Sequence, residues 1–173
     1  MIKFYIEPGY DVNKPEREYG NAGIDFFIPK MTSTFRNAFL AKNGGMFKKD
    51  ENQKWNIHIP AHGRVNIPSG VRSRISPNIA LEAQNKSGIA TKLGLVYGAS
   101  VIDASYKGII HLSVINTTDK EVMLPLGTKL VQFIPRLIDT GGIEVVTDGS
   151  VDEFYADFEF SNRGEGAFGS TGV

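Results

Sequence analysis

The feature that most constrains the fold is a long succession of short apolar segments, each ended within a few residues by Gly, Pro, Asn or Asp. Residues 110–114 (IHLSV) show the alternation expected of a strand with one buried face. Many short strands at close spacing, with no helices alternating between them, favour a sandwich, jelly roll or barrel. The sequence therefore predicts an all-β domain. The predicted strands are Lys3–Ile6, Ile24–Ile28, Asn56–Ile59, Gly70–Ile75, Ile79–Gln84, Gly94–Tyr97, Ile109–Ile115, Glu121–Leu124, Lys129–Pro135 and Ile143–Val146.

Two segments interrupt this rhythm of strands. Thr34–Ala41 has apolar residues at helical spacing, a Ser or Thr available as a cap, and Gly44-Gly45 after it, which predicts a short helix. The polar run Lys48–Lys54 that follows is interpreted as an exposed loop. Ser150–Tyr155, near an end rich in acidic and aromatic residues, is interpreted as a turn of helix or an ordered connector.

Composition and charge exclude several classes of function. With 19 basic and 19 acidic residues the chain lacks the basic excess of a broad nucleic-acid surface, although a few cations suffice for one nucleotide. The absence of cysteine excludes disulfides, zinc-thiolate sites and cysteine nucleophiles. The histidines show no metal-binding pair at helical spacing, so ordinary surface or core roles are expected for His58, His62 and His111.

The length of 173 residues fits one domain, or one domain with an insertion. No stretch has the apolar length needed to span a bilayer. The alternating start, 1–6, is interpreted as a first strand rather than a signal peptide, so a soluble cytoplasmic protein without a membrane association is expected.

The end of the chain differs in character from the rest, which divides it into a β-domain over 1–161 and a glycine-rich arm over 162–173. Four glycines fall within residues 163–172, and glycine loses the most backbone entropy when it is ordered. A disordered end is the ordinary reading of such a tail. Here, however, an Arg, a Phe and two adjacent hydroxyl residues are interleaved with the glycines. These side chains suit a mobile phosphate-binding arm with a base-stacking ring, ordered only when ligand binds.

Four further segments carry polar groups suited to nucleotide chemistry, although each also has an ordinary structural explanation. Lys86-Ser87-Gly88 after a strand offers a cation, a hydroxyl and a close approach to an anion, but it is also a common surface turn. Asp103 follows two β-branched residues and could act as a general base for water, or could merely stabilise a turn. Gln132 within an apolar run needs hydrogen-bond partners, which neighbouring backbone could supply. Asp25 lies near the start of a strand and does not by itself indicate a function.

Together these pieces resemble, in order, the five signature motifs of the trimeric deoxyuridine triphosphatase (dUTPase) family. Each motif alone is weak, but five in the same order over nearly the whole chain are specific. The matching segments are Ala22–Asp25, Lys86–Ala90 with Lys92 and Gly94, Val101–Asp103 with Tyr106 and Gly108, Gly127–Ile134 with the central Gln132, and Arg163–Gly172.

The resemblance implies a jelly-roll-like distorted β-barrel assembled as a homotrimer, with each active site formed between subunits and closed by a C-terminal arm. It implies hydrolysis of dUTP to dUMP and pyrophosphate with Mg²⁺, which keeps uracil out of DNA and supplies dUMP for thymidylate synthesis. Asp103 would activate the water that attacks the α-phosphorus, and Asp25 would order water around the metal. The positions assigned to substrate are Lys86, Ser87, Gly88, Gly98, Ile102, Tyr106, Gln132, Arg163, Phe168, Gly169, Ser170 and Thr171.

These assignments give each group a distinct role. Tyr106 would lie against the deoxyribose and exclude a ribose 2′-hydroxyl, while backbone of the 98–108 hairpin would read uracil in a slot too tight for a thymine methyl. Lys86, Ser87 and Gln132 would contact the phosphates. Arg163, Ser170 and Thr171 would reach the terminal phosphates, with Phe168 stacked on the uracil.

The chain departs from the family pattern at several positions. Asn85-Lys86 stands where the second motif usually has Pro-Arg, so the charge is kept but the planar fork is lost. Ser100 and Ser105 replace a Gly and an Asp of the third motif, and Ala167 replaces a Gly of the fifth. Residues 31–55 have no counterpart in compact members, and we interpret them as an inserted surface element that could dock a protein partner or be merely tolerated.

Two other readings compete with this one. The related dCTP deaminases carry a catalytic Glu on the strand after the third motif, but the matching position here is Ser113, and no carboxylate lies between Gly108 and Asn116. An inactive structural trimer would have no reason to keep Asp103, Tyr106 and the arm together.

Overall fold

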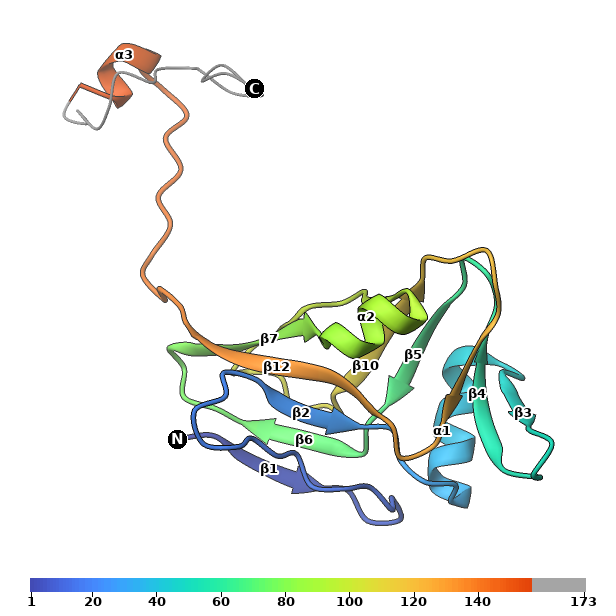
Figure 1. Cartoon of the computed structure of the whole chain (residues 1–173). Coiled ribbons are helices and arrows are strands. Elements are labelled where there is room, and N and C mark those ends of the chain that lie inside the picture. Colours follow the sequence, from blue (N-terminus) through green and yellow to red (C-terminus); the bar gives the residue numbers. More distant parts are fainter. Residues whose placement is uncertain (157–173) are drawn as a thin grey trace. The chain divides into compact units, whose positions relative to one another are not determined.

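The computed structural model describes residues 1–156 of the chain. Strands dominate it, and three short helices connect or flank them (Figure 1). In chain order the elements are β1 (Lys3–Ile6), β2 (Ile24–Phe27), α1 (Ser33–Asn43), β3 (Phe47–Lys49), β4 (Trp55–Ile59), β5 (Arg64–Pro68), β6 (Val71–Arg74), β7 (Ile79–Asn85), α2 (Ser87–Leu93), β8 (Leu95–Tyr97), β9 (Val101–Ile102), β10 (His111–Asn116), β11 (Val122–Pro125), β12 (Lys129–Leu137) and α3 (Val151–Phe154).

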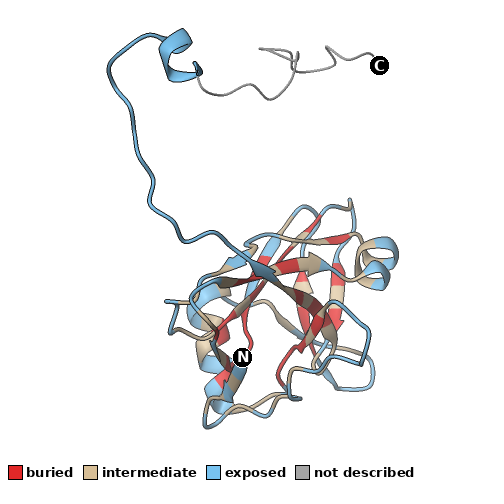
Figure 2. Ribbon diagram, turned by 90° about the vertical axis from the view of Figure 1, so that its left-hand side faces the viewer, coloured by how far each residue is buried: buried red, intermediate tan, exposed pale blue. Residues whose placement is uncertain are grey.

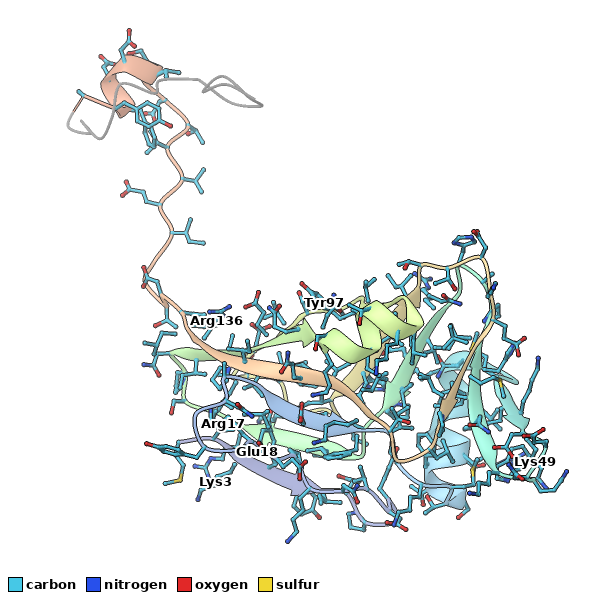
Figure 3. All side chains as sticks on the ribbon, in the orientation of Figure 1. Lys3, Arg17, Glu18, Lys49, Tyr97 and Arg136 are labelled. Atoms are coloured by element: carbon cyan, nitrogen blue, oxygen red, sulfur yellow. The ribbon has the colours of Figure 1, made fainter. Side chains whose placement is uncertain are left out.

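The strands form four small sheets in which every pairing is antiparallel. The largest has the order β2-β12-β7-β9, so that strands distant in sequence lie side by side. The other sheets are β5-β10-β8, β11-β4-β3 and the pair β1-β6. A cross-strand ion pair reinforces the largest sheet, because Arg136 of β12 (labelled in Figure 3) donates from Nε to Glu82 of β7 at 2.9 Å. The mostly β, jelly-roll-like fold predicted from the sequence is thereby confirmed.

A single apolar core lies between these sheets, and buried residues follow the strands of the folded body (Figure 2). Aromatic rings make up much of it: Phe26 contacts Phe133 edge-on at 4.9 Å between centroids, and Phe4 in turn contacts Phe26 at 5.4 Å. Each fully buried ring contributes about 1.5–3 kcal/mol relative to an exposed one. This packing gives β2 and β12, which carry two of the predicted site segments, a rigid support.

Helix α1 confirms the predicted helix, and it begins with a cap at Thr32, whose Oγ1 accepts a hydrogen bond from Phe35 N at 3.1 Å. Its inner face, however, is part of the core, because Phe35 and Phe39 are completely buried. The expectation that 31–55 lies on the surface is therefore wrong for this helix. The two rings are one helical turn apart, so both point to the same side.

Most predicted strands are present within a residue or two of their expected ends, but four segments differ. The exposed loop was expected over Lys48–Lys54, yet its first two residues belong to β3, which lies on the edge of β4, where lysines are well tolerated. Strands β5 and β9 were missed, since β5 contains Asn and Pro and β9 has only two residues. The predicted strand over 143–146 is absent, because no described strand pairs with it.

The chain separates into two compact units, residues 1–140 and 141–173. The described part of the second contains α3, a single helical turn that bears out the prediction for 150–155. Ser150 and Glu153 form a reciprocal capping box that fixes its start. The predicted boundary between 161 and 162 lies outside the described residues. No helix among residues 1–156 has the length and apolar character to cross a bilayer.

Candidate active site

The second and fourth motifs meet at one cavity. Lys86 follows β7 directly and Ser87 opens α2, while Gln132 lies on the neighbouring strand β12. The cavity has a volume of about 430 Å³ and its lining contains a hydroxyl, an amide and three ammonium groups. It is lined by Lys86, Ser87, Gly88, Ile89, Lys92, Leu93, Lys129 and Gln132. A concave surface with this excess of cations suits a polyanion such as a triphosphate.

The Gln132 side chain is held between the first and second motifs. Its Nε2 donates to the carbonyl of Asn85 at 3.0 Å, so neighbouring backbone does supply one of the partners a polar group here requires. Gly23 packs so closely on it that a Cβ added there would lie 2.3 Å from Gln132 Oε1. The Asn85 side chain is itself held, because its Oδ1 accepts a hydrogen bond at 2.9 Å from the backbone N of Tyr97, which is labelled in Figure 3. Position 23 must therefore be glycine for this amide to keep its place.

A charged cluster borders the same cavity. Asp25 accepts from Lys86 Nζ at 2.5 Å on Oδ1, and from Lys129 Nζ at 3.2 Å on Oδ2. Lys129 also contacts Glu16 Oε1 at 2.7 Å. The hydrogen bonds that Lys129 donates to Glu16 and then to Asp25 raise its pKa, so this ammonium stays protonated. The side chains of Asp25 and Lys86 are only 19% and 23% exposed, which keeps their charges close to the cavity.

Lys129 was not among the residues expected from the sequence. Its position, three residues before Gln132 at the start of β12, places its side chain on the cavity wall beside Lys86. The signal was a cation at the start of the fourth motif, but a lysine at a strand end is common on any surface.

The third motif forms a separate hairpin. Asp103 is exposed at the end of β9, and its carbonyl accepts a hydrogen bond from Tyr106 N at 3.1 Å to close a turn. The Tyr106 hydroxyl donates to the carbonyl of Ile109 at 2.9 Å, which folds the ring back over the hairpin. At its other end, Gly98 N donates to the carbonyl of Ser113 at 2.9 Å. A Cβ at position 98 would come within 2.7 Å of Ser113 Oγ, so a side chain there would require the Ser113 hydroxyl to turn away.

Within one chain, the residues that line the Lys86 cavity and those of the third-motif hairpin do not meet. Ile102 pairs with Leu81 of β7, and the antiparallel register carries Asp103 farther from the end of β7 that leads into Lys86. The four residue steps along β7 from Leu81 to Asn85 span about 13 Å, so the register places Asp103 farther than this from the residue that precedes Lys86. The arm residues Arg163, Phe168, Gly169, Ser170 and Thr171 lie outside the described residues.

None of the histidines takes part in these groups. His62 pairs with Asp119 at 2.9 Å on the surface, and His58 contacts Glu121. Burial lowers the pKa of the half-buried His111, which favours its neutral form. Among residues 1–156, no three His, Asp or Glu side chains are gathered in a way that could hold a metal ion.

Comparison with known proteins places the chain among dUTPases. The dUTPase family model matches residues 52–172. The deoxyuridine 5'-triphosphate nucleotidohydrolase of Yarrowia lipolytica is 34% identical over 66% of this chain and 69% of its own length, and that of Solanum lycopersicum is 28% identical over 96% and 93%. A mutant dUTPase of Staphylococcus bacteriophage 80alpha, solved with dUpNHpp, has a TM-score of 0.73 at 17% identity and covers 100% of this chain and 99% of that one. Five ordered motifs, a cationic cavity and a family match over most of its length establish that the chain belongs to the dUTPase family.

Proposed function

We propose that the protein is a dUTP diphosphatase that hydrolyses dUTP to dUMP and pyrophosphate. The observation that carries this proposal is that Lys86, Ser87, Gln132 and Lys129 line the same cavity. A triphosphate has close to four negative charges and needs several donors before a carboxylate can approach it. In the cell this reaction would keep uracil out of DNA and supply dUMP for thymidylate synthesis.

The phosphates would share the two lysines with the carboxylates that these lysines already contact. In the described chain the Lys86 and Lys129 ammonium groups neutralise Asp25 and Glu16. Ammonium groups have three donors each, so both can turn part of their hydrogen bonding toward phosphate oxygens without leaving their carboxylates. Ser87 and the Gln132 amide would add neutral donors on the same wall.

The reacting water would be activated by Asp103. Its carboxylate is exposed and makes no ion pair within residues 1–156, so it is available to accept a proton. As that proton leaves, the water oxygen would form a bond to the α-phosphorus. The bond from that phosphorus to the oxygen bridging to the β-phosphate would then break, releasing pyrophosphate.

The hairpin that holds Asp103 would also select the nucleoside. Tyr106, its ring folded over the hairpin by the bond to Ile109, would lie against the deoxyribose and leave no space for a 2′-hydroxyl. Backbone groups between Gly98 and Ile102 would read the uracil edge. The neighbouring Ser113 supplies no carboxylate for deamination, which supports hydrolysis of a uracil nucleotide over removal of a cytosine amino group.

A homotrimer would bring the two groups of residues together. The distance between Asp103 and the cavity in one chain supports a site completed by a second subunit, in which the hairpin of one chain faces the cavity of another. Exposed apolar side chains fit such an assembly, since Leu137 is 81% and Val101 57% exposed. Arg163, Phe168, Gly169, Ser170 and Thr171 of an arm would then close over the bound nucleotide.

Magnesium would be held mainly by the substrate. Both Asp25 oxygens already accept from lysines, so direct ligation by this carboxylate does not fit, but each oxygen keeps a lone pair for a metal-bound water. Mg²⁺ keeps several waters and binds through substrate phosphates in many enzymes, so these residues suit an outer-sphere role. The ion would neutralise phosphate charge as it develops.

The test is to incubate the purified protein with each of the dNTPs, and with UTP, in the presence of Mg²⁺. We expect pyrophosphate from dUTP and no ammonia from dCTP. Ammonia release, or no pyrophosphate from dUTP under any divalent-ion condition, would contradict the proposal.

A further inference from the structure

One arginine joins the 98–108 hairpin to a carboxylate near the N-terminus. Arg72 lies on β6, and its Nε donates to Glu7 Oε2 at 2.6 Å. Its Nη1 donates to the carbonyl of Lys107 at 2.5 Å, one residue after Tyr106. Both charged side chains are partly shielded, with 38% of Arg72 and 29% of Glu7 exposed. A single guanidinium thus bridges a carboxylate near the N-terminus and the backbone of the hairpin.

This bond falls where the hairpin has few other ties to the body. The returning chain is fixed to β6 at Ile110, whose N donates to Val71 O at 2.8 Å and whose carbonyl accepts from Ser69 N at 3.0 Å. Between Ile110 and the turn at Asp103, Arg72 provides the next hydrogen bond from β6 to the hairpin backbone. The hydrogen bond from Arg72 therefore restrains the backbone immediately after the turn formed by residues 103–106.

Glu7 fixes the direction of the guanidinium. Its own backbone is anchored, because Glu7 N donates to Gly70 O at 2.8 Å and Tyr5 pairs with Arg72 in the β1–β6 register. The hydrogen bond from Arg72 lowers the pKa of Glu7, so the carboxylate is ionised at neutral pH. The planar fork of arginine can serve two acceptors at a fixed angle, which a lysine ammonium does not reproduce.

We propose that Arg72, oriented by Glu7, is a positioning residue that sets the turn bearing Asp103 and Tyr106. The role rests on the proposed function, because it acts through the base and the sugar-contacting ring of that reaction. Arg72 contacts the hairpin through the Lys107 carbonyl, and in this role it would act on the positions of Asp103 and Tyr106 rather than on the substrate. Its loss would let the turn shift, misplacing the carboxylate relative to the phosphorus and the ring relative to the sugar.

Two readouts follow from this placement. A displacement of about 1 Å can reduce catalysis by roughly 100-fold, so Arg72→Met should lower kcat for dUTP about 10- to 100-fold. A looser Tyr106 should also admit ribose, so the ratio of kcat/KM for dUTP over UTP should fall about fivefold or more. A purely stabilising ion pair would lower the melting temperature without changing either quantity.

The experiment uses the full chain with dUTP, UTP and Mg²⁺. Arg72→Met is compared with Arg74→Met, which removes the same charge from an exposed position on the same strand. Arg72→Lys keeps the charge without the fork, and Glu7→Gln keeps a hydrogen-bond acceptor without the charge. We expect intermediate losses of kcat and of sugar discrimination in these two variants, and wild-type values for Arg74→Met.

The outcomes separate this role from the proposed function. A wild-type enzyme that does not hydrolyse dUTP would remove both. An active wild type with folded Arg72 variants of unchanged kcat and unchanged dUTP preference would overturn the positioning role alone, whatever their melting temperatures. Should Arg72→Met fail to fold, Arg72→Lys and Glu7→Gln decide by the same two readouts.

Discussion

Helix α1 offers the sharpest test of how the segment 31–55 is built into the protein. Phe39 is completely buried, and its ring lies 4.3 Å from that of Phe47 and 5.9 Å from that of Phe35, measured between centroids. Replacing a buried Phe by Ala removes its transfer free energy and leaves a cavity, which together cost about 3–5 kcal/mol. Because a domain is stable by only about 5–15 kcal/mol, Phe39→Ala should remove a large part of the free energy of unfolding.

Urea unfolding measures this loss directly. With a urea m-value of about 2 kcal/mol/M, the midpoint of Phe39→Ala should fall by about 1.5–2.5 M at the same protein concentration. Asn37→Ala, on the exposed side of the same helix, is the matched control and should change stability by no more than about 0.5 kcal/mol. Equal midpoints for the two variants would show that α1 is a dispensable surface addition, contrary to its burial.

Further predictions concern the site and its charges. Asp103→Asn should abolish turnover while dUTP still binds, as measured by calorimetry, and normal hydrolysis would refute its role as base. Truncation before Arg163 should leave a folded oligomer with severely reduced activity, whereas unfolding on chromatography and circular dichroism would make the tail structural. Lys129→Met should lower kcat/KM for dUTP about 10- to 100-fold through a lost charged hydrogen bond, while Lys30→Met, away from the cavity, should not. Because the folded pKa of Glu7 is lowered from an ordinary 4.5, the stability gap between wild type and Glu7→Gln should be full above about pH 5 and shrink on acidification, and a pH-independent gap would contradict this.

The burial of α1 also changes how partner docking through 31–55 should be tested. Deleting the whole segment would remove Phe35, Phe39 and strand β3, so loss of activity would report a damaged core rather than a lost docking surface. Substitutions in the exposed residues 51–54 are the better probe. Docking through this segment itself stays a prediction.

The sequence predicted the fold well because most strands carry their own alternation. The helix α1 was visible for the same reason, but its burial was not, since Phe35 and Phe39 at helical spacing indicate an apolar face without saying what covers it. Residues 143–146 were predicted to form a strand and do not. Their sequence pattern indicates that they could pair with a strand, but it does not show whether a neighbouring strand is available.

The order of the motifs identified most of the candidate site. Contacts between residues distant in the chain could not be predicted from the sequence, because they depend on how the strands pair in the fold. Lys86 and Gln132 were expected at the phosphates, and they line one cavity. Lys129 and Arg72 were missed because each resembles an ordinary surface cation until its neighbours are known. Their partners, Asp25 for the first and Glu7 with the Lys107 carbonyl for the second, are distant in the chain.

The register that keeps Asp103 away from the Lys86 cavity has a consequence for mixtures of two inactive variants. If each site borrows its base from one chain and its lysine from another, two separately dead variants can repair each other. Co-refolded Asp103→Asn and Lys86→Met subunits would contain some sites in which an intact aspartate faces an intact lysine, so activity would reappear on mixing. In a mixture of chains, the activity of each site would then depend on which two chains meet there, and not on either chain alone.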